Sequence, residues 1–263
     1  MSDAITAGLH LLGRGKVLFD RYDNSGLSTG LRHMGNVEDL KINIATEKIE
    51  KRDFTQAAAP IAVEAITKTT GTVTMVSDEY GLENIAIFML GLEAALTTQG
   101  SGSFALPGTP DTLVVPALDR IIKMTKQNVS ALTVKDSPQT TTYVVNTDYK
   151  IFDAARGLLY IPSGSAITAG QTIKCGYTYG VVGQLSKVQI AQAPVIEGAL
   201  YFVSVPGKGP GWDCEIWKMR VGGNGDLGLI QQDDWGVLSI EGTILADAAN
   251  HPTEPYGIFV KRS

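Results

Sequence analysis

The residue types that most often perform catalysis are few in this chain and far apart. Its three histidines are His10, His33 and His251, and none has a nearby partner that could hold the ring for acid–base chemistry. The adjacent carboxylates Asp233 and Asp234 could begin a cation site. No third ligand is near them in the sequence, however, so a solvated turn is the favoured interpretation. We therefore predict that the protein is not an enzyme and has no metal site.

Two further patterns that could carry chemistry are incomplete. The glycine-rich stretch at residues 222–225 lacks the Lys-Ser/Thr pair of a phosphate-binding loop, and no helix is predicted after it. The two cysteines, Cys175 and Cys214, lie in different parts of the chain and form no Cys-x-x-Cys pattern. Free thiols in a protein made in a reducing cytosol are the expectation, and no cofactor is expected.

Composition narrows the class of protein further. The chain has 263 residues, enough for one large β domain or two smaller ones, and a net charge of −5. A protein that grips nucleic acid through its phosphates needs a basic stripe, which this balance disfavours. Charged residues make up only 19% of the chain and 29 residues are glycine. The low charge content and the many glycines fit either a surface that makes subunit contacts or a β protein with many turns.

Two long segments near the N-terminus are expected to be strands, and a functional surface would be built on them. In residues 37–50 the apolar Leu40, Ile42 and Ile44 alternate with Lys41 and Asn43, the period of a half-buried strand. A second strand is expected over residues 61–76. A helix is expected over residues 79–90, capped by Ser77 or Asp78, ended by Gly91, and buried along one face. That face would consist of Leu82, Ile85, Ala86, Met89 and Leu90.

The middle of the chain has a different character. Residues 99–110 have the composition of a linker, and short strand-like runs separated by turns follow them, as in a small β sandwich. Longer strands are expected again at residues 199–205, 214–221 and 235–245, with a short one at 256–260. The predicted division is residues 1–100, an inserted module at 101–185, and 186–263. No signal peptide and no membrane-spanning segment are expected.

The order of these elements resembles the bacteriophage major tail tube protein family. The resemblance covers about residues 10–98 and 186–260. It is carried by residues 13–20, 35–36, 45–50, 77–91, 217–221, 225–230 and 238–247. The middle segment, through residues 146–149 and 167–171, resembles a β module inserted in various phage tail proteins.

The resemblance implies a fold and a task. The fold would be all-β with one helix: a tail-tube β-sandwich/barrel subunit carrying an inserted small Ig-like β module. Subunits would form hexameric rings that stack into a hollow tube for genome delivery, with the helix outside the channel barrel. The protein would be part of the virion tail, assembled in the host cytoplasm, and would contact tail tip or baseplate, terminator and tape measure proteins. Double-stranded DNA would pass without specific binding, and no membrane contact is expected.

Two sets of residues are candidates for this task. The channel lining is predicted from the polar residues that alternate with apolar ones on the two long strands: Lys41, Asn43, Glu47, Glu64, Lys68, Thr70 and Thr72. The connection between these strands, at residues 50–60, is too long for a tight turn. It is a candidate for contact between subunits, or a surface loop without a partner. Its candidate contact residues are Arg52, Asp53, Phe54, Thr55 and Gln56.

Two alternative functions remain open from the sequence. One is the tube protein of a related injection machine, similar to the Hcp rings of type VI secretion, although those chains are shorter and lack the inserted module. The other is a carbohydrate-binding β module on a virion surface, with Trp212, Trp217 and Trp235 stacking on sugars. In a β protein such aromatic residues more often lie in a core or an interface. Assembly would discriminate, because a binding module would stay small in solution.

Overall fold

The computed structural model describes residues 10–55 and 57–262. It is an all-β structure with one helix in those residues, which confirms the predicted class. The chain divides into two compact units, Met1–Ala94 with Val188–Ser263, and Ala95–Lys187. The predicted divisions at residues 100/101 and 185/186 lie six residues after the first of these boundaries and two residues before the second.

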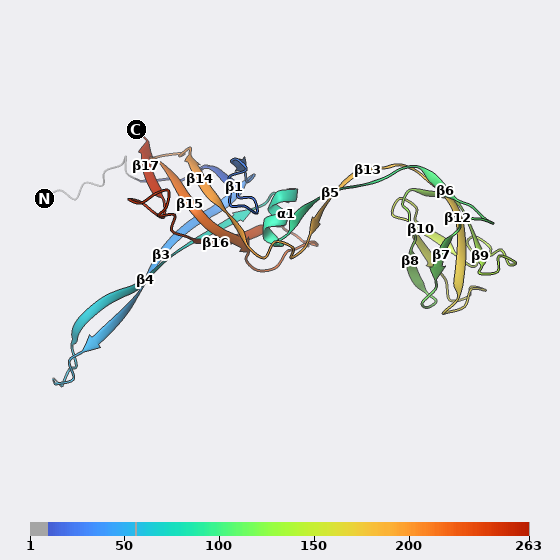
Figure 1. Ribbon diagram of the computed structural model, residues 1–263, viewed down its shortest axis with the longest axis horizontal. Coiled ribbons are helices and arrows are strands. Elements are labelled where there is room, and N and C mark those ends of the chain that lie inside the picture. The colour runs from blue at the N-terminus through green and yellow to red at the C-terminus, as the bar shows by residue number, and fades with distance from the viewer. Residues whose placement is uncertain (1–9, 56, 263) are drawn as a thin grey trace. The chain divides into compact units, whose positions relative to one another are not determined.

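The first unit is built on one antiparallel sheet (Figure 1). The strands follow the order β2-β1-β14-β15-β16-β4-β3, and β17 pairs with the same edge of β15 as β16 does. Their bounds are β1 (Gly15–Arg21), β2 (Arg32–His33), β3 (Val37–Arg52), β4 (Ile61–Ser77), β14 (Ile196–Ser204), β15 (Gly211–Gly223), β16 (Leu238–Ile244) and β17 (Ile258–Arg262).

The sheet does not close on itself within the described residues, and β2 and β3 are the two ends of its strand order. The barrel implied for a single subunit is therefore not found. Strand β16 begins three residues later than predicted, at Leu238. Trp235, which the pattern had placed in this strand, is instead an exposed loop residue.

The core of the first unit lies between the sheet and the helix α1 (Leu82–Phe88). The helix is shorter than predicted and begins after Gly81, with no side chain capping it. Ser77 accepts a hydrogen bond from the Glu79 amide and so caps a turn before the helix. The buried helical residues are Asn84, Ala86, Ile87 and Phe88. Of the predicted face only Ala86 is among them, because less than two turns of helix meet the sheet.

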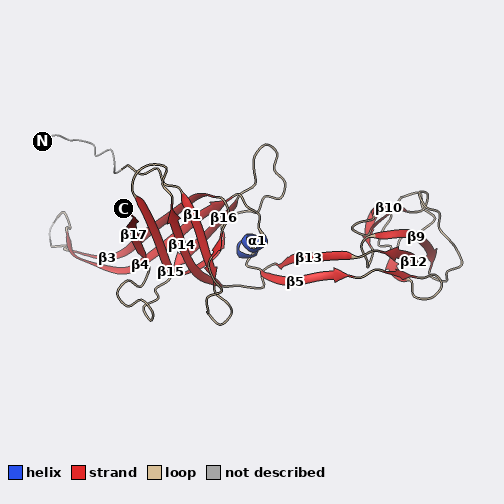
Figure 2. Cartoon of the chain, turned by 90° about the horizontal axis from the view of Figure 1, so that it is seen from above, coloured by secondary structure: helices blue, strands red, loops and turns tan. Residues whose placement is uncertain are grey.

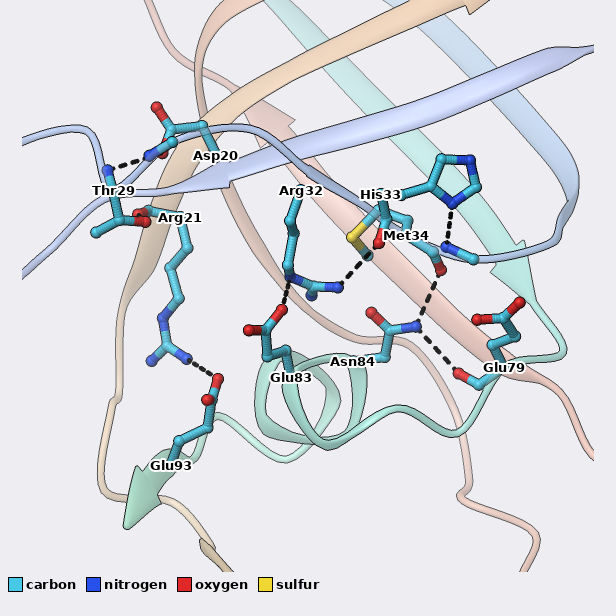
Figure 3. A network of polar contacts seen from close by, with 12 residues as sticks. Asp20, Arg21, Thr29, Arg32, His33, Met34, Glu79, Glu83, Asn84 and Glu93 are labelled. Carbon is cyan, nitrogen blue, oxygen red and sulfur yellow. Dashed lines mark hydrogen bonds and ion pairs between the residues drawn. The ribbon is translucent and has the colours of Figure 1, made fainter. Parts of the chain in front are cut away.

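Polar contacts fix this helix to the β1–β2 edge of the sheet (Figure 3). The buried Asn84 amide donates to the carbonyl oxygens of Met34 and Glu79, both at 3.0 Å. Arg32 forms an ion pair with Glu83 in the first helical turn. The Arg21 guanidinium donates to the Gly91 carbonyl at 3.1 Å, just past the helix. The helix position is thus set by side-chain hydrogen bonds as well as by apolar packing.

The second unit consists of two small sheets around a separate core. One sheet joins β6 (Gly102–Phe104), β12 (Thr172–Tyr179), β7 (Asp111–Val114) and β9 (Val129–Asp136). The other joins β10 (Lys150–Asp153), β11 (Leu158–Ile161) and β8 (Arg120–Lys123). Strand β6 lies within the segment predicted as a linker, residues 99–110, and β7 begins directly after it.

The two passages of the chain between the units are strands themselves. β5 (Leu92–Gln99) and β13 (Val182–Gln189) pair into a two-stranded sheet (Figure 2). The sequence had indicated only a linker at residues 99–110 and a module boundary at 185/186. Their pairing could not be read from either segment alone, because a strand is completed by a partner distant in the sequence.

Candidate functional site

The sheet of the first unit has one face on the core and one polar face. The register aligns Asn43 with Thr72, Thr72 with Thr243, and Thr243 with Arg220, so these four side chains form a row across β3, β4, β16 and β15. A parallel row contains Lys41, Thr74 and Glu241. The alternate residues, such as Ile42, Val73 and Val221, belong to the core or pack against it. We call the side opposite the core the polar face.

Charges on the polar face are closely matched. Its cations include Lys41, Lys68, Lys218 and Arg220, and its anions include Asp39, Glu47, Glu197 and Glu241. Lys41 is paired with Asp39, and Lys68 lies 3.2 Å from Glu47. Each of these four cations therefore has a carboxylate partner on the same face, with Lys218 and Arg220 sharing one. Lys16 of β1 and Lys51 of β3 lie on this face too and form no ion pair within the described residues.

Glu197 is the shared carboxylate. Its two oxygens accept hydrogen bonds from Lys218 and Arg220, each at 2.9 Å. These two bonds, with the Lys218 bond the larger effect, hold the pKa of Glu197 below its usual range. The carboxylate therefore stays ionised and keeps both cations neutralised. Sequence reasoning missed this group, because Glu197 is 21 residues from Lys218 and 23 from Arg220 along the chain and meets them only through the β14–β15 register.

The structure brings six of the seven channel-lining candidates together on the polar face. These are Lys41, Asn43, Glu47, Lys68, Thr70 and Thr72. The seventh, Glu64, lies on the opposite face, where it stands opposite Glu50 and accepts a hydrogen bond from Lys48 at 2.6 Å. A bulge causes this difference, because Glu47 pairs with Lys68 and Lys48 with Ile66. Thr67 is thereby left without a register partner, and the alternation of β4 is reversed beyond it.

Beyond the sheet, β3 and β4 continue as a two-stranded arm, here residues 44–71. Among the described strands they pair only with each other there, since β16 follows β4 only over residues 71–77. Ile44, Ile49, Ile61, Val63 and Ile66 of the arm are all exposed large apolar residues. Both faces of the arm are therefore accessible, although apolar side chains lie on each.

The tip of the arm carries the predicted inter-subunit residues. The Asp53 amide donates to the Pro60 carbonyl at 2.8 Å, and an Asp53 carboxylate oxygen accepts from the Thr55 amide at 2.9 Å. Arg52 ends β3 and pairs with Glu50 at 3.1 Å. Phe54 is 82% exposed. Gln56 lies outside the described residues. Local hydrogen bonds thus order the tip so that it presents an aromatic ring.

Two of the histidines considered for catalysis, and one of the tryptophans considered for sugar binding, make contacts with neighbouring residues. His33 accepts a hydrogen bond from the Gly35 amide at 3.0 Å. His251 stacks on Trp217 with ring centroids 3.9 Å apart, and the Trp217 indole donates to the Glu254 carbonyl at 2.8 Å. One face of the Trp217 ring is therefore covered, and that face offers no stacking surface to a sugar.

The two thiols are buried in different units. Cys175 lies in the core of the second unit and Cys214 in that of the first. Burial raises the pKa of Cys175 to about 12 and that of Cys214 to about 11. Both are therefore protonated at neutral pH. Within residues 10–55 and 57–262, no three His, Cys, Asp or Glu side chains are grouped so that they could hold a metal ion.

A protein-family model matches almost the whole chain. The model of the family described as "Protein of unknown function UCP028589" matches residues 10–263. No curated protein matches the chain. Over the described part of the chain, no helix combines the length and apolar character that crossing a membrane requires.

Proposed function

Because the chain belongs to that family, whose description names no activity, we propose a function from its surfaces: a structural subunit of a phage tail tube. Copies associate into hexameric rings, and the rings stack into a hollow cylinder through which the genome is delivered. This assignment places the protein in the virion tail. Its neighbours there are further copies, tail tip and terminator proteins at the two ends, and a tape measure protein in the lumen.

The polar face is the observation that carries this proposal. A surface that binds DNA tightly presents cations that replace the counterions of the phosphates. On the polar face Lys41, Lys68, Lys218 and Arg220 are each paired with a carboxylate, and the last two share Glu197. Such a face is wetted and polar but offers phosphate no excess positive charge. It suits the wall of a channel along which double-stranded DNA must slide.

The open edge and the arm support assembly. The 16-residue strand β3 is at the end of the strand order, and an uncovered edge of this length invites pairing with another chain. The exposed Ile49, Val63 and Ile66 of the arm add apolar surface that a single subunit leaves in water. A ring of copies would cover both features. The barrel around the channel would then be completed by several subunits.

Electron microscopy of the purified chain, with light scattering alongside, tests the proposal. Hollow rings or tubes are expected. Chains that stay monomeric at high concentration, and remain so after addition of a tail tip complex, would contradict it.

The second unit would decorate the outside of the tube, which fits a non-contractile tail, because a sheath around the tube would leave no room for it.

A further inference from the structure

The second unit carries an excess of positive charge. Between residues 95 and 187 the chain has eight lysines and arginines and five aspartates, so this unit has a net charge of +3. The whole chain has a net charge of −5, and the remaining residues therefore carry −8. A basic part on an otherwise acidic chain indicates an anionic partner for that part.

The aspartates of the second unit are all engaged in hydrogen bonds inside it. They are Asp111, Asp119, Asp136, Asp148 and Asp153. Among the described residues only Asp153 pairs with a cation, Arg156. These carboxylates therefore hold the fold together and leave the lysines of the unit without balancing charge.

Two of these lysines lie side by side on the four-stranded sheet. Lys174 of β12 pairs in register with Lys135 of β9, and the row continues to Thr112 on one side and Thr142 on the other. Ile173, next to Lys174, is buried in the core, so the row lies on the opposite face. Neither lysine forms an ion pair within the described residues, although Lys174 donates to the Thr112 hydroxyl at 2.8 Å. Like charges directly opposite each other destabilise a sheet, and a bound anion would remove this cost.

The strands of this sheet place no carboxylate on the same face in the described residues. Asp136, which follows Lys135 in the sequence, pairs in register with Ile173 on the core side, and its carboxylate accepts hydrogen bonds from Thr140 and Thr141. The neighbouring rows of the face contain one glycine and otherwise only hydroxyl side chains. We call the whole set the lysine–hydroxyl face: Thr112, Lys174, Lys135, Thr142, Gly176, Thr133, Ser103, Thr178 and Ser130.

A cavity of about 380 Å³ opens on the lysine–hydroxyl face. Its polar lining consists of Ser103, Thr133, Lys135 and Thr178. Leu106 forms an apolar wall, because it packs over Gly176, where a Cβ would lie 2.8 Å from the Leu106 Cγ. The volume is at the lower end of the range for small-molecule sites, about 300–1,000 Å³. The cavity thus offers one positive end, several hydroxyls and one apolar side.

We propose that the lysine–hydroxyl face binds a saccharide that carries a negatively charged group, either a carboxylate or a phosphate. The charged group lies between Lys135 and Lys174, where it forms charge-assisted hydrogen bonds. The ring hydroxyls bond to Thr133 and Ser103, and an apolar side of the ring contacts Leu106. This binding site goes beyond the proposed function and does not depend on it.

The same face is poorly suited to nucleic acid. Proteins that bind single strands stack the bases on exposed aromatic rings. The aromatic side chains of β6 and β12 are Phe104, Tyr177 and Tyr179, and they pack against one another on the core side. Double-stranded DNA needs a longer row of cations than two lysines provide.

Saturation-transfer difference NMR on the unaltered chain, with glucuronate and glucose 6-phosphate as probes, tests the site. Both probes should bind, and glucose, which lacks the charge, should bind about tenfold more weakly. Inorganic phosphate, which lacks the ring, should also bind more weakly than glucose 6-phosphate. Thr133→Val should weaken the binding of charged and neutral sugars alike.

Lys135→Gln and Lys174→Gln should each weaken the binding of both charged probes by about tenfold and leave that of glucose unchanged. Because Lys135→Gln removes a like-charge pair, it should not lower the melting temperature. Lys150→Gln, on β10 in the other sheet of the same unit, is the matched control. It makes the same change in net charge and should bind both probes like the unaltered chain.

Three outcomes would overturn the inference. The site is wrong if neither charged probe binds, or if Lys150→Gln weakens binding as much as Lys135→Gln does. If inorganic phosphate binds as tightly as glucose 6-phosphate, the lysines hold an anion without recognising a sugar, and the saccharide assignment fails. None of these results requires tube formation, so the inference and the proposed function fail independently.

Discussion

At the residue scale, the polar face depends on a few carboxylates that each hold a cation. Glu197 is the most consequential of them, because it holds Lys218 and Arg220 at once. Lys41 and Lys68 have one carboxylate each. Since the pairs are exposed or only half-buried, they contribute little to stability. The main effect of these ion pairs is on the electrostatic potential that a phosphate group meets as it approaches the polar face.

Glu197→Gln should convert the polar face into a weak DNA-binding surface. The change leaves Lys218 and Arg220 without their acceptor, and each freed cation can neutralise one phosphate. The slope of log K against log salt concentration for binding to double-stranded DNA should steepen by about 0.9 per freed cation. Filter binding at several salt concentrations measures this slope. Glu254→Gln makes the same change in net charge at a side chain that forms no ion pair in the described part of the chain. An equal effect there would contradict the masking role of Glu197.

Asp213 should make stability depend on pH. Its carboxylate accepts hydrogen bonds from the Ser204 amide at 2.9 Å and the Arg262 guanidinium at 2.6 Å, and these lower its pKa, the backbone bond most. Because the folded pKa lies below the unfolded one, this stabilisation is present above pH ~4 and is lost as the pH falls through the folded pKa.

Urea unfolding across pH compares the unaltered chain with Asp213→Asn. The variant should be less stable at pH 7, and the difference in free energy of unfolding should shrink steadily below pH ~4. A difference that stays constant down to the lowest pH at which the chain folds would show that the charge of Asp213 is not its cause.

At the scale of elements, alternation predicted where the long strands lie but not how they pair. Lys41 and Asn43 were placed correctly opposite the core by a period of two. Glu64 was placed on the wrong side, since the bulge at Thr67 has no signature in the sequence. Glu197 was missed because its partners come from another strand. The alternation of polar and apolar residues predicts where a strand lies and which residues share a face, whereas the register depends on the partner strand.

Gly198→Ala should destabilise the centre of the sheet. A Cβ at Gly198 would lie 2.2 Å from the carbonyl oxygen of Asp20 and 2.5 Å from the Phe19 ring, so the backbones of β14 and β1 would have to separate. The expected loss in free energy of unfolding is about 1–3 kcal/mol by urea denaturation. Gly13→Ala, where the nearest atoms are 3.9 Å away, should change it far less. Equal losses would mean that close packing is not the cause.

Deleting residues 55–59 should prevent assembly without unfolding the subunit. The arm tip is exposed and makes local hydrogen bonds, such as that from the Asp53 amide to the Pro60 carbonyl, so the core does not depend on it. The variant should keep the melting temperature of the unaltered chain but form no tubes in electron microscopy. Normal tubes would remove the arm tip from the inter-subunit contacts.

At the scale of the whole molecule, two separate cores lie on one chain. The core of the first unit contains Phe19, Ile240 and Met219, and that of the second contains Ile161, Ile173 and Tyr149. Composition and turn spacing were enough to predict a small β module in the middle of the chain. The β5–β13 pairing was not predicted, because β5 ends where a linker was expected to begin and β13 spans the module boundary expected at 185/186.

The second unit should fold in isolation. Residues 95–187 expressed alone should show one cooperative thermal transition in calorimetry, and the intact chain should show a transition at the same temperature. The physical reason is a core made entirely from that unit's own residues. An unfolded fragment would show that the second unit needs the rest of the chain, and the first unit would then have to be studied with it in place.

Because Cys175 and Cys214 are buried, assembly can be followed with labels on cysteines introduced elsewhere. A maleimide reacts with an accessible thiolate, and both native thiols are buried and protonated at neutral pH. The natural thiols should therefore not react with maleimide fluorophores or spin labels, so they need not be removed before labelling. One cysteine introduced at Phe54 or Trp235 would report the environment of that position alone, and growth of a polymer could be timed from its emission.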